Sequence, residues 1–242
     1  MDKKIAQKLI AKTRDDYNKI AEPFSSSRSA FNWSHVAAAI EKLQIKKSSK
    51  VLDLGCGNGR VLDILGKFEI NYTGLDLSPK LIDLAQKKYP AENFIVGNLL
   101  DTPFLENEFD LVLSLATLHH IPSEEQRISA LSEIYRVLKP SGMVLITVWY
   151  FWDKPKFKEE MTATLLNQKS NKANLEYGDF LKPWKDSQGN ILAERYFHAW
   201  EKDELKDLLA QVGFIDIRLS DNKDDKNNNL IVTAQKLKSN SG

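Results

Sequence analysis

Residues 51–60 read Val-Leu-Asp-Leu-Gly-Cys-Gly-Asn-Gly-Arg, a short apolar run that leads into three closely spaced glycines. Glycine lets the backbone approach a ligand closely, and amide groups at the start of a following helix favour a negative group such as a carboxylate. The spacing is G-x-G-x-G, whereas the dinucleotide fingerprint is G-x-G-x-x-G, and Arg60 would crowd a pyrophosphate. The stretch therefore predicts a strand, a ligand-binding loop and a helix.

Short apolar runs alternate with amphipathic segments on the carboxyl side of this loop. Ser78-Pro79 offers an N-cap followed by proline at the first helical position, and Ser123-Glu-Glu-Gln126 is a capping-box pattern. Such alternation is typical of a parallel sheet with helices on both faces, and the last two runs indicate an antiparallel hairpin at its edge. We expect strands at 50–54, 71–76, 93–96, 109–115, 142–149, 213–220 and 230–236, and helices at 59–68, 79–88, 124–138 and 202–212.

Two segments lie outside this alternation. Residues 1–45 hold two expected helices, at 3–20 and 33–43, separated by a Pro/Ser-rich break at 22–29. Residues 150–198 are rich in aromatics and follow the fifth strand, at the carboxyl edge where open α/β sheets bind ligands. We expect a single domain, 1–242, in which 150–198 is a lid or acceptor-recognition insertion. A surface excursion with its own small core is the plainer interpretation, and the two are compatible.

Composition narrows the classes of function. The 242 residues carry a net charge of +1, so the total charge produces no strong nucleic-acid field. Residues 1–50 hold eleven Lys/Arg against five Asp/Glu, which a solvated helix face explains more simply than an RNA footprint. The single cysteine, Cys56, excludes an intramolecular disulfide and indicates a reducing compartment. With neither a signal peptide nor 18 consecutive apolar residues, we expect a cytoplasmic protein that does not enter a membrane.

Polar residues at the ends of the next strands extend the glycine loop into a cofactor site. Asp76 ends the second strand, from which an acidic side chain can accept both ribose hydroxyl protons. Asn98 follows the third strand, where it could accept from an adenine amino group. Asp76 could instead cap a helix and Asn98 could make a turn, but their order and spacing favour a nucleoside cofactor. The expected contacts are Asp53, Gly55, Cys56, Gly57, Asn58, Gly59, Asp76, Leu77, Asn98, Leu99 and Leu115.

With DLGCGNGR at 53–60 as a first motif and Asp76 as the ribose-binding acid, residues 51–149 resemble class I S-adenosylmethionine (SAM)-dependent methyltransferases. The resemblance implies a Rossmann-like, mostly parallel, doubly wound sheet and methyl transfer from SAM. It places Gly55 and Gly57 at the methionine end of the cofactor and Asn98 with Leu99 at the adenine. Many members carry Asp where this chain has Asn98, which keeps an acceptor oxygen but no charge.

Further segments share a narrower pattern. They are Tyr17-Asn-Lys-Ile-Ala-Glu-x-Phe-Ser-x-x-Arg28, 114–121, 127–140, 145–149, 180–184 and Arg195-Tyr-Phe-His198. They are similar to the tRNA methyltransferases that esterify 5-carboxymethyluridine at the anticodon wobble position, and this likeness covers nearly the whole chain. It implies tRNA as acceptor and a small zinc-binding activator subunit as a possible partner. After Trp149 the chain reads Tyr-Phe-Trp-Asp, where that subfamily usually has a small residue and then a Glu-Gln pair.

A carboxylate acceptor suits the residues that are present. It is already ionised at neutral pH and needs positioning rather than a general base. Pyrimidine-carbon methylation usually needs a cysteine nucleophile, and amine methylation usually needs an Asp/Asn-Pro-Pro-aromatic stretch; the one cysteine lies in the glycine loop, and that stretch is absent. Arginines hold carboxylates or phosphates by paired hydrogen bonds. We expect Arg28, Arg127, Arg195 and His119 at the acceptor, with Trp184 and Tyr196 available to stack on a base.

Other interpretations stay open at this stage. Arg127 could be a surface helix residue, and His119-His120 could be a structural pair. Without a nearby Cys or carboxylate pattern, we expect no metal site. A small-molecule O- or C-methyltransferase shares the cofactor motifs, and a non-catalytic SAM-binding module is a third possibility. Convergence of Arg28 and Arg195 on one open, positive face would favour tRNA, whereas a closed apolar pocket would favour a small molecule.

Overall fold

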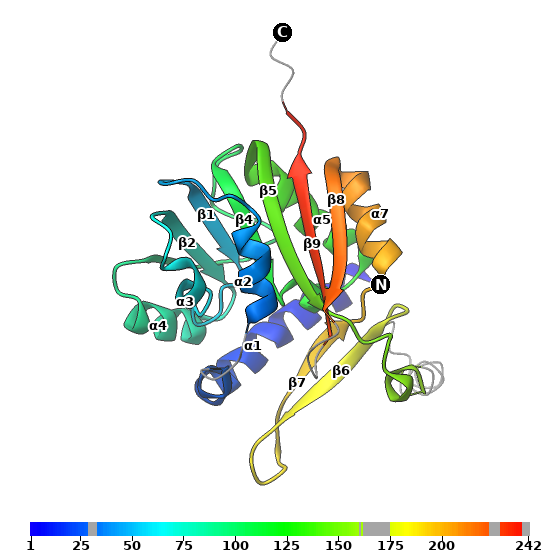
Figure 1. The fold of residues 1–242 in the computed structure, drawn as a ribbon. Helices are drawn as coiled ribbons and strands as arrows, with labels where there is room; N and C mark the ends of the chain where they lie inside the picture. Colours follow the sequence, from blue (N-terminus) through cyan, green and yellow to red (C-terminus); the bar gives the residue numbers. More distant parts are fainter. Residues whose placement is uncertain (29–32, 160, 162–174, 223–227, 239–242) are drawn as a thin grey trace.

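A twisted sheet in the order β3-β2-β1-β4-β5-β9-β8 forms the centre of the molecule (Figure 1). The computed structural model describes residues 1–28, 33–159, 161, 175–222 and 228–238, without the side chains of Arg28 and Asn222. Strands β1 to β5 run parallel, while β9 lies antiparallel between β5 and β8, so the expected Rossmann-like sheet with a C-terminal hairpin is confirmed. The strands are β1 (Lys50–Leu54), β2 (Asn71–Asp76), β3 (Asn93–Val96), β4 (Phe109–Leu115), β5 (Leu138–Trp149), β8 (Phe214–Asn222) and β9 (Asn229–Lys236).

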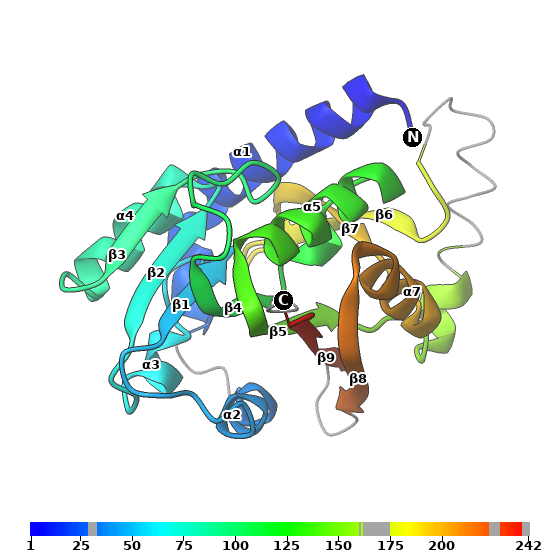
Figure 2. The same ribbon diagram turned by 90° about the horizontal axis from the view of Figure 1, so that it is seen from above.

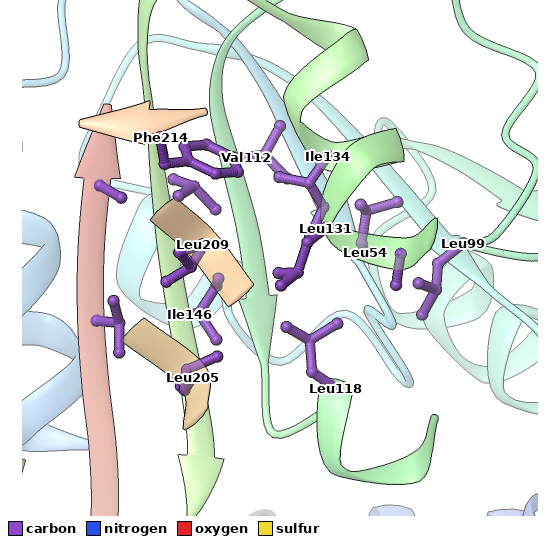
Figure 3. Close-up of a cluster of buried hydrophobic side chains, with 14 of the residues drawn as sticks. Leu54, Leu99, Val112, Leu118, Leu131, Ile134, Ile146, Leu205, Leu209 and Phe214 are labelled. Carbon is purple, nitrogen blue, oxygen red and sulfur yellow. The ribbon is translucent and has the colours of Figure 1, made fainter. Parts of the chain in front are cut away.

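Helices cover both faces of this sheet (Figure 2). Helices α5 (Glu124–Val137) and α7 (Lys202–Val212) pack on one face, and α2 (Ser34–Glu41) and α3 (Leu62–Leu65) pack on the other. Leu131 and Leu205 contact the first face beside Val112 and Ile146 (Figure 3). Burial on both faces explains why the parallel strands are near-continuous apolar runs rather than alternating ones.

Two predicted helix starts are confirmed, and one predicted helix is wrong in length. Ser78 Oγ accepts from the Leu81 amide at 3.3 Å before α4 (Pro79–Lys88), and Ser123 Oγ accepts from the Gln126 amide at 3.3 Å before α5. The helix expected at 59–68 shrinks to the four residues of α3. The chain that leads into α3 forms tight turns instead, in which an amide donates to the carbonyl three residues earlier. The Leu62 amide, for example, donates to the Gly59 carbonyl at 3.0 Å.

The N-terminal helix is longer than expected. Helix α1 (Lys3–Arg28) continues through Pro23, so the predicted break at 22–29 is wrong as far as the described residues reach. An internal proline costs about 3 kcal/mol in a helix. Phe24, the next residue, packs edge-on against Tyr17 at 5.3 Å and lies 5.7 Å from Trp184 between ring centroids, so tertiary packing of the last turns offsets that cost.

The insertion contributes a hairpin, β6 (Asp179–Lys185) and β7 (Ile191–His198), which lies with α1 at the carboxyl ends of the parallel strands (Figure 1). Its base has its own apolar cluster, which includes Phe151, Phe157 and Phe197. Residues 160 and 162–174 of the insertion, and 223–227 of the polar link between β8 and β9, lie outside the described residues. In the described part of the chain no helix is long and apolar enough to cross a membrane.

Candidate active site

The glycine loop follows β1 and turns sharply beside β2. Gly55, Gly57 and Gly59 have φ of +77°, +56° and +73°, the left-handed region that favours glycine. A Cβ on Gly55 would lie 2.2 Å from the Thr117 hydroxyl oxygen, so glycine is required there by space as well. The Gly55 amide donates to the Leu75 carbonyl at 2.7 Å, which joins the loop to β2.

Asp76, at the end of β2, is oriented by the backbone. One carboxylate oxygen accepts from the Gly57 amide and the other from the Ser78 amide, both at 2.8 Å. Burial raises the pKa of Asp76 despite these hydrogen bonds. After β3, Asn98 Oδ1 accepts from the Leu100 amide at 3.0 Å, so this side chain makes the turn that was the plainer interpretation and also lines the pocket.

A second buried carboxyl group lies at the end of β1. Asp53 accepts a hydrogen bond from the Tyr72 hydroxyl at 3.0 Å. Burial raises the pKa of Asp53 to about 7, although the bond from Tyr72 acts in the opposite direction. Two buried acids in one pocket suit a ligand with cationic groups and ribose hydroxyls, which SAM carries.

One pocket joins the expected cofactor residues to a second group, His119, His120, Trp149 and Arg195, which we call the acceptor side. Ten of the eleven expected contacts line it; the exception is Gly59, whose α-carbon faces the rings of Phe94 and Tyr89. Helix α1 also lines it, through Ile10, Thr13, Arg14, Tyr17 and Phe24; Tyr17 and Phe24 fall within a segment that carries the family resemblance, but none of the five was predicted for the site. Their shared helical face was the available signal.

Arg195 lies on the acceptor side of this pocket and is only 3% exposed. Its NH1 group donates to the Tyr17 hydroxyl at 3.3 Å. The rings of Trp184, Phe197 and Tyr17 surround the guanidinium at 5.0, 5.1 and 5.7 Å from their centroids. Its Nε has no hydrogen-bond partner, and none of the carboxylates in the described residues forms an ion pair with it.

His120 occupies the other side of Tyr17. Its Nδ1 lies 2.7 Å from the Tyr196 carbonyl oxygen, which can only accept, so Nδ1 carries the proton. Its Nε2 therefore accepts from the Tyr17 hydroxyl at 2.8 Å. Burial lowers the pKa of His120 to about 3, and the charge of Arg195 acts in the same direction, so the imidazole is neutral at physiological pH.

His119 also lines the pocket and is neutral. Its Nδ1 accepts from the Trp149 amide at 3.4 Å, which leaves Nε2 as the protonated nitrogen. Its ring stacks on Phe197 at 5.0 Å with an angle of 15° between planes. Burial, reinforced by the neighbouring His120 and Arg195, lowers its pKa well below the usual value. His119 can thus offer a hydrogen-bond donor to an acceptor, as an orienting group rather than as a base.

Two expected acceptor residues, Arg127 and Tyr196, do not line this pocket, and the side chain of a third, Arg28, is not described. Arg127 is 3% exposed and faces Glu176 at 3.0 Å and Glu204 at 3.5 Å, in a buried ion-pair cluster behind β7. It is therefore neither an acceptor contact nor a surface residue. Tyr196 is fully buried, and its hydroxyl donates to Asp179 at 2.5 Å, so it cannot stack on a base. The side chain of Arg28 lies outside the described residues, so its convergence with Arg195 stays a prediction.

Together, the sheet order, the glycine loop and Asp76 define a class I SAM-dependent methyltransferase. A family model described as a methyltransferase domain matches residues 52–146. The SAM-dependent methyltransferase of Methanosarcina mazei superposes with a TM-score of 0.69 at 23% identity, over 83% of this chain and 98% of that one. At that identity the structural likeness concerns the fold.

Sequence relatives give a narrower assignment. A tRNA (carboxymethyluridine(34)-5-O)-methyltransferase of Schizosaccharomyces pombe is 30% identical over 204 residues, 81% of this chain and 86% of that protein. A protein of the same name from Arabidopsis thaliana is 40% identical over 133 residues, 55% of this chain but 31% of that relative, of which this chain therefore spans about a third. The chain belongs to the family of tRNA (carboxymethyluridine(34)-5-O)-methyltransferases.

Proposed function

We propose that this protein transfers a methyl group from SAM to the carboxylate of 5-carboxymethyluridine at the wobble position of tRNA, forming the methyl ester. The observation that carries the proposal is Arg195, a buried cation without a carboxylate partner among the described residues, in the pocket that also contains Asp76 and the glycine loop. An isolated buried charge costs several kcal/mol. An anionic acceptor would supply the missing partner and would match the planar guanidinium.

The residues of the pocket bind and orient rather than exchange protons. SAM supplies a methyl group on a sulfonium, and its transfer to a carboxylate yields a neutral ester and a neutral thioether. Because opposite charges cancel during this step, apolar surroundings favour it; Trp149 lines the pocket, and the ring of Phe197 stacks on Trp149. Arg195 stabilises the charged acceptor before transfer, so its contribution belongs to acceptor binding. We expect His119 to donate from Nε2 to an oxygen of the acceptor, because its Nδ1 accepts from the Trp149 amide and the residue lines the pocket.

The test uses methyl-labelled SAM with tRNA that carries 5-carboxymethyluridine, unmodified tRNA as control, and mild alkali after the reaction. We expect label on the modified tRNA alone, released by alkali as an ester requires. Label on free carboxylic acids but not on RNA would instead support the small-molecule alternative. Alkali-stable label on unmodified tRNA would contradict ester formation.

The role of Arg195 predicts a specific kinetic defect. Arg195→Gln should raise KM for the modified RNA by about 100-fold, because the acceptor carboxylate loses its cation. SAM affinity should stay unchanged, since Arg195 forms no hydrogen bond or ion pair with the glycine loop, residues 55–59, among the described residues. Arg218→Gln, an exposed arginine on β8, is the matched control and should behave as wild type. A large loss of SAM affinity in Arg195→Gln would contradict the assignment.

A protein partner is part of the proposal. A methyltransferase of this fold from Haloferax volcanii, 17% identical with a TM-score of 0.67 over 93% of this chain and 97% of that one, was solved in complex with the Trm112 methyltransferase activator. The family resemblance also implies such a subunit. We therefore propose that a small activator subunit raises activity. The labelling assay with and without a candidate activator tests this, and equal rates would contradict it.

A further inference from the structure

Helix α1 brings the side chain of Tyr17 between Arg195 and His120, on the acceptor side of the pocket. The helix is tied down on either side of that position. Lys12 Nζ donates to the Glu194 carbonyl of β7 at 2.6 Å. One residue after Tyr17, the Asn18 side chain accepts from the Ser78 hydroxyl at 2.7 Å, at the start of α4. Tyr17 is therefore held against β7 by contacts that do not involve its own hydroxyl.

The hydrogen bonds of the Tyr17 hydroxyl have a fixed direction. Nδ1 of His120 is the protonated nitrogen, so Nε2 can only accept, and the phenolic proton points to it. The lone pairs of the phenolic oxygen are left for Arg195, whose NH1 donates at 3.3 Å. This is the only side-chain hydrogen bond of Arg195 within the described residues.

We propose that Tyr17 is the positioning residue that orients Arg195 toward an anionic acceptor without neutralising it, an inference that rests on the function proposed above. A carboxylate in the place of Tyr17 would also hold the guanidinium, but it would pair with the charge and compete with the substrate. A phenol is a neutral acceptor, so the cation stays available. The rings of Trp184 and Phe197 limit its other orientations by contact alone.

The test measures binding to two RNAs that differ only in charge. Anticodon stem-loops with 5-carboxymethyluridine or with the neutral 5-carbamoylmethyluridine are titrated in the presence of S-adenosylhomocysteine. Wild type should prefer the carboxylate RNA. Tyr17→Phe keeps the ring and deletes the hydroxyl, and should weaken binding of the carboxylate RNA by about 10- to 100-fold, as for a lost hydrogen bond to a charged group. Its affinity for the amide RNA should stay unchanged.

A double-mutant cycle separates positioning from a general structural effect. In an Arg195→Gln background, Tyr17→Phe should cause no further loss, because it acts through Arg195. His120→Leu removes the acceptor of the phenolic proton, so the hydroxyl is no longer oriented, and it should reproduce the defect; this keeps the test valid if Tyr17→Phe fails to fold. Tyr177→Phe is the matched control. Tyr177 belongs to the insertion, lies outside the pocket and interacts with the charged Glu201, so its loss should keep the wild-type preference.

The outcomes separate the proposed role of Tyr17 from the proposed methyltransferase function on which it rests. Wild type that neither methylates nor prefers the carboxylate RNA would overturn both. Wild type with the preference, lost in Arg195→Gln but kept in Tyr17→Phe and His120→Leu, would overturn the role of Tyr17 alone. Equal losses for both RNAs in Tyr17→Phe would also overturn it, because a structural defect would not select for charge.

Discussion

At the scale of single residues, Asp53 makes cofactor binding sensitive to pH. Burial raises its pKa to about 7, so the carboxyl group is neutral below that pH and anionic above it. SAM is cationic at its sulfonium, so it binds the anionic form better. SAM affinity should therefore rise by up to about 10-fold between about pH 6 and pH 8, as the ionised fraction rises. Calorimetric titrations at three pH values measure it, and should show proton release near pH 7.

Two variants check that Asp53 is the titrating group. Asp53→Asn should flatten the pH profile. Tyr72→Phe removes the hydrogen bond that stabilises the carboxylate, so it should move the midpoint to higher pH. A wild-type profile that is already flat would contradict the assignment.

Neighbouring residues on β7 show where inference from sequence stops. The cofactor residues could be predicted because a glycine loop and a strand-end acid occupy fixed places in this fold. Arg195 and Tyr196 are adjacent, and pattern alone suggested both for the acceptor, yet only Arg195 enters the pocket. Successive side chains of a strand point to opposite faces, but β7 is buried on both faces from Arg195 onward. The sequence of this strand therefore shows no polar–apolar alternation that would indicate which side chains face the pocket. Only the tertiary structure identifies them.

At the scale of secondary-structure elements, a buried ion-pair cluster fastens the insertion to the methyltransferase core. Arg127 of α5 meets Glu204 of α7 at 3.5 Å and Asp179 of β6 at 3.9 Å. His198 of β7 bridges the same two acids, at 2.8 Å from Asp179 and 2.9 Å from Glu204. Burial disfavours its charged form, but these two bonds raise its pKa overall. The cluster thus fixes the strand that carries Arg195.

This arrangement predicts that Arg127 contributes to stability. Arg127→Met leaves the buried acids without their arginine and should lower the free energy of unfolding by about 3–5 kcal/mol. Chemical denaturation measures the loss, and SAM affinity of the folded fraction should be retained. Near-normal stability combined with lost RNA methylation would instead return Arg127 to the acceptor site.

Elements were more predictable than their limits. The central strands could be located because each is an apolar run bounded by turn residues. The predictions that were wrong concern segments in which local sequence signals compete with tertiary packing. Pro23 predicts a helix end, but Phe24 packs on Trp184 and α1 continues. A helix was predicted at 59–68, but the residues directly after Gly59 form tight turns at the end of the glycine loop.

At the scale of the whole molecule, α1 connects the cofactor loop to the acceptor side. The Asn58 side chain of the glycine loop donates to the Ser25 hydroxyl at 2.7 Å. Two turns earlier on the same helix, Tyr17 contacts Arg195 and His120. A ligand that fixes the glycine loop therefore also favours the position of α1 in which Tyr17 meets Arg195. Such shared stabilisation is a coupling free energy between two sites, and it must be reciprocal.

The coupling predicts that cofactor and RNA strengthen each other's binding. Saturating S-adenosylhomocysteine should tighten binding of the carboxymethyluridine stem-loop by about 5-fold or more, and the RNA should tighten S-adenosylhomocysteine binding by the same factor. Ser25→Ala cuts the contact between α1 and the glycine loop, so it should reduce both factors toward one while each ligand alone binds nearly as before. Fluorescence titrations of either ligand, with and without the other, measure the four constants. Undiminished coupling in Ser25→Ala would mean that the two sites communicate through direct contact between the ligands, and α1 would then act on the acceptor side alone.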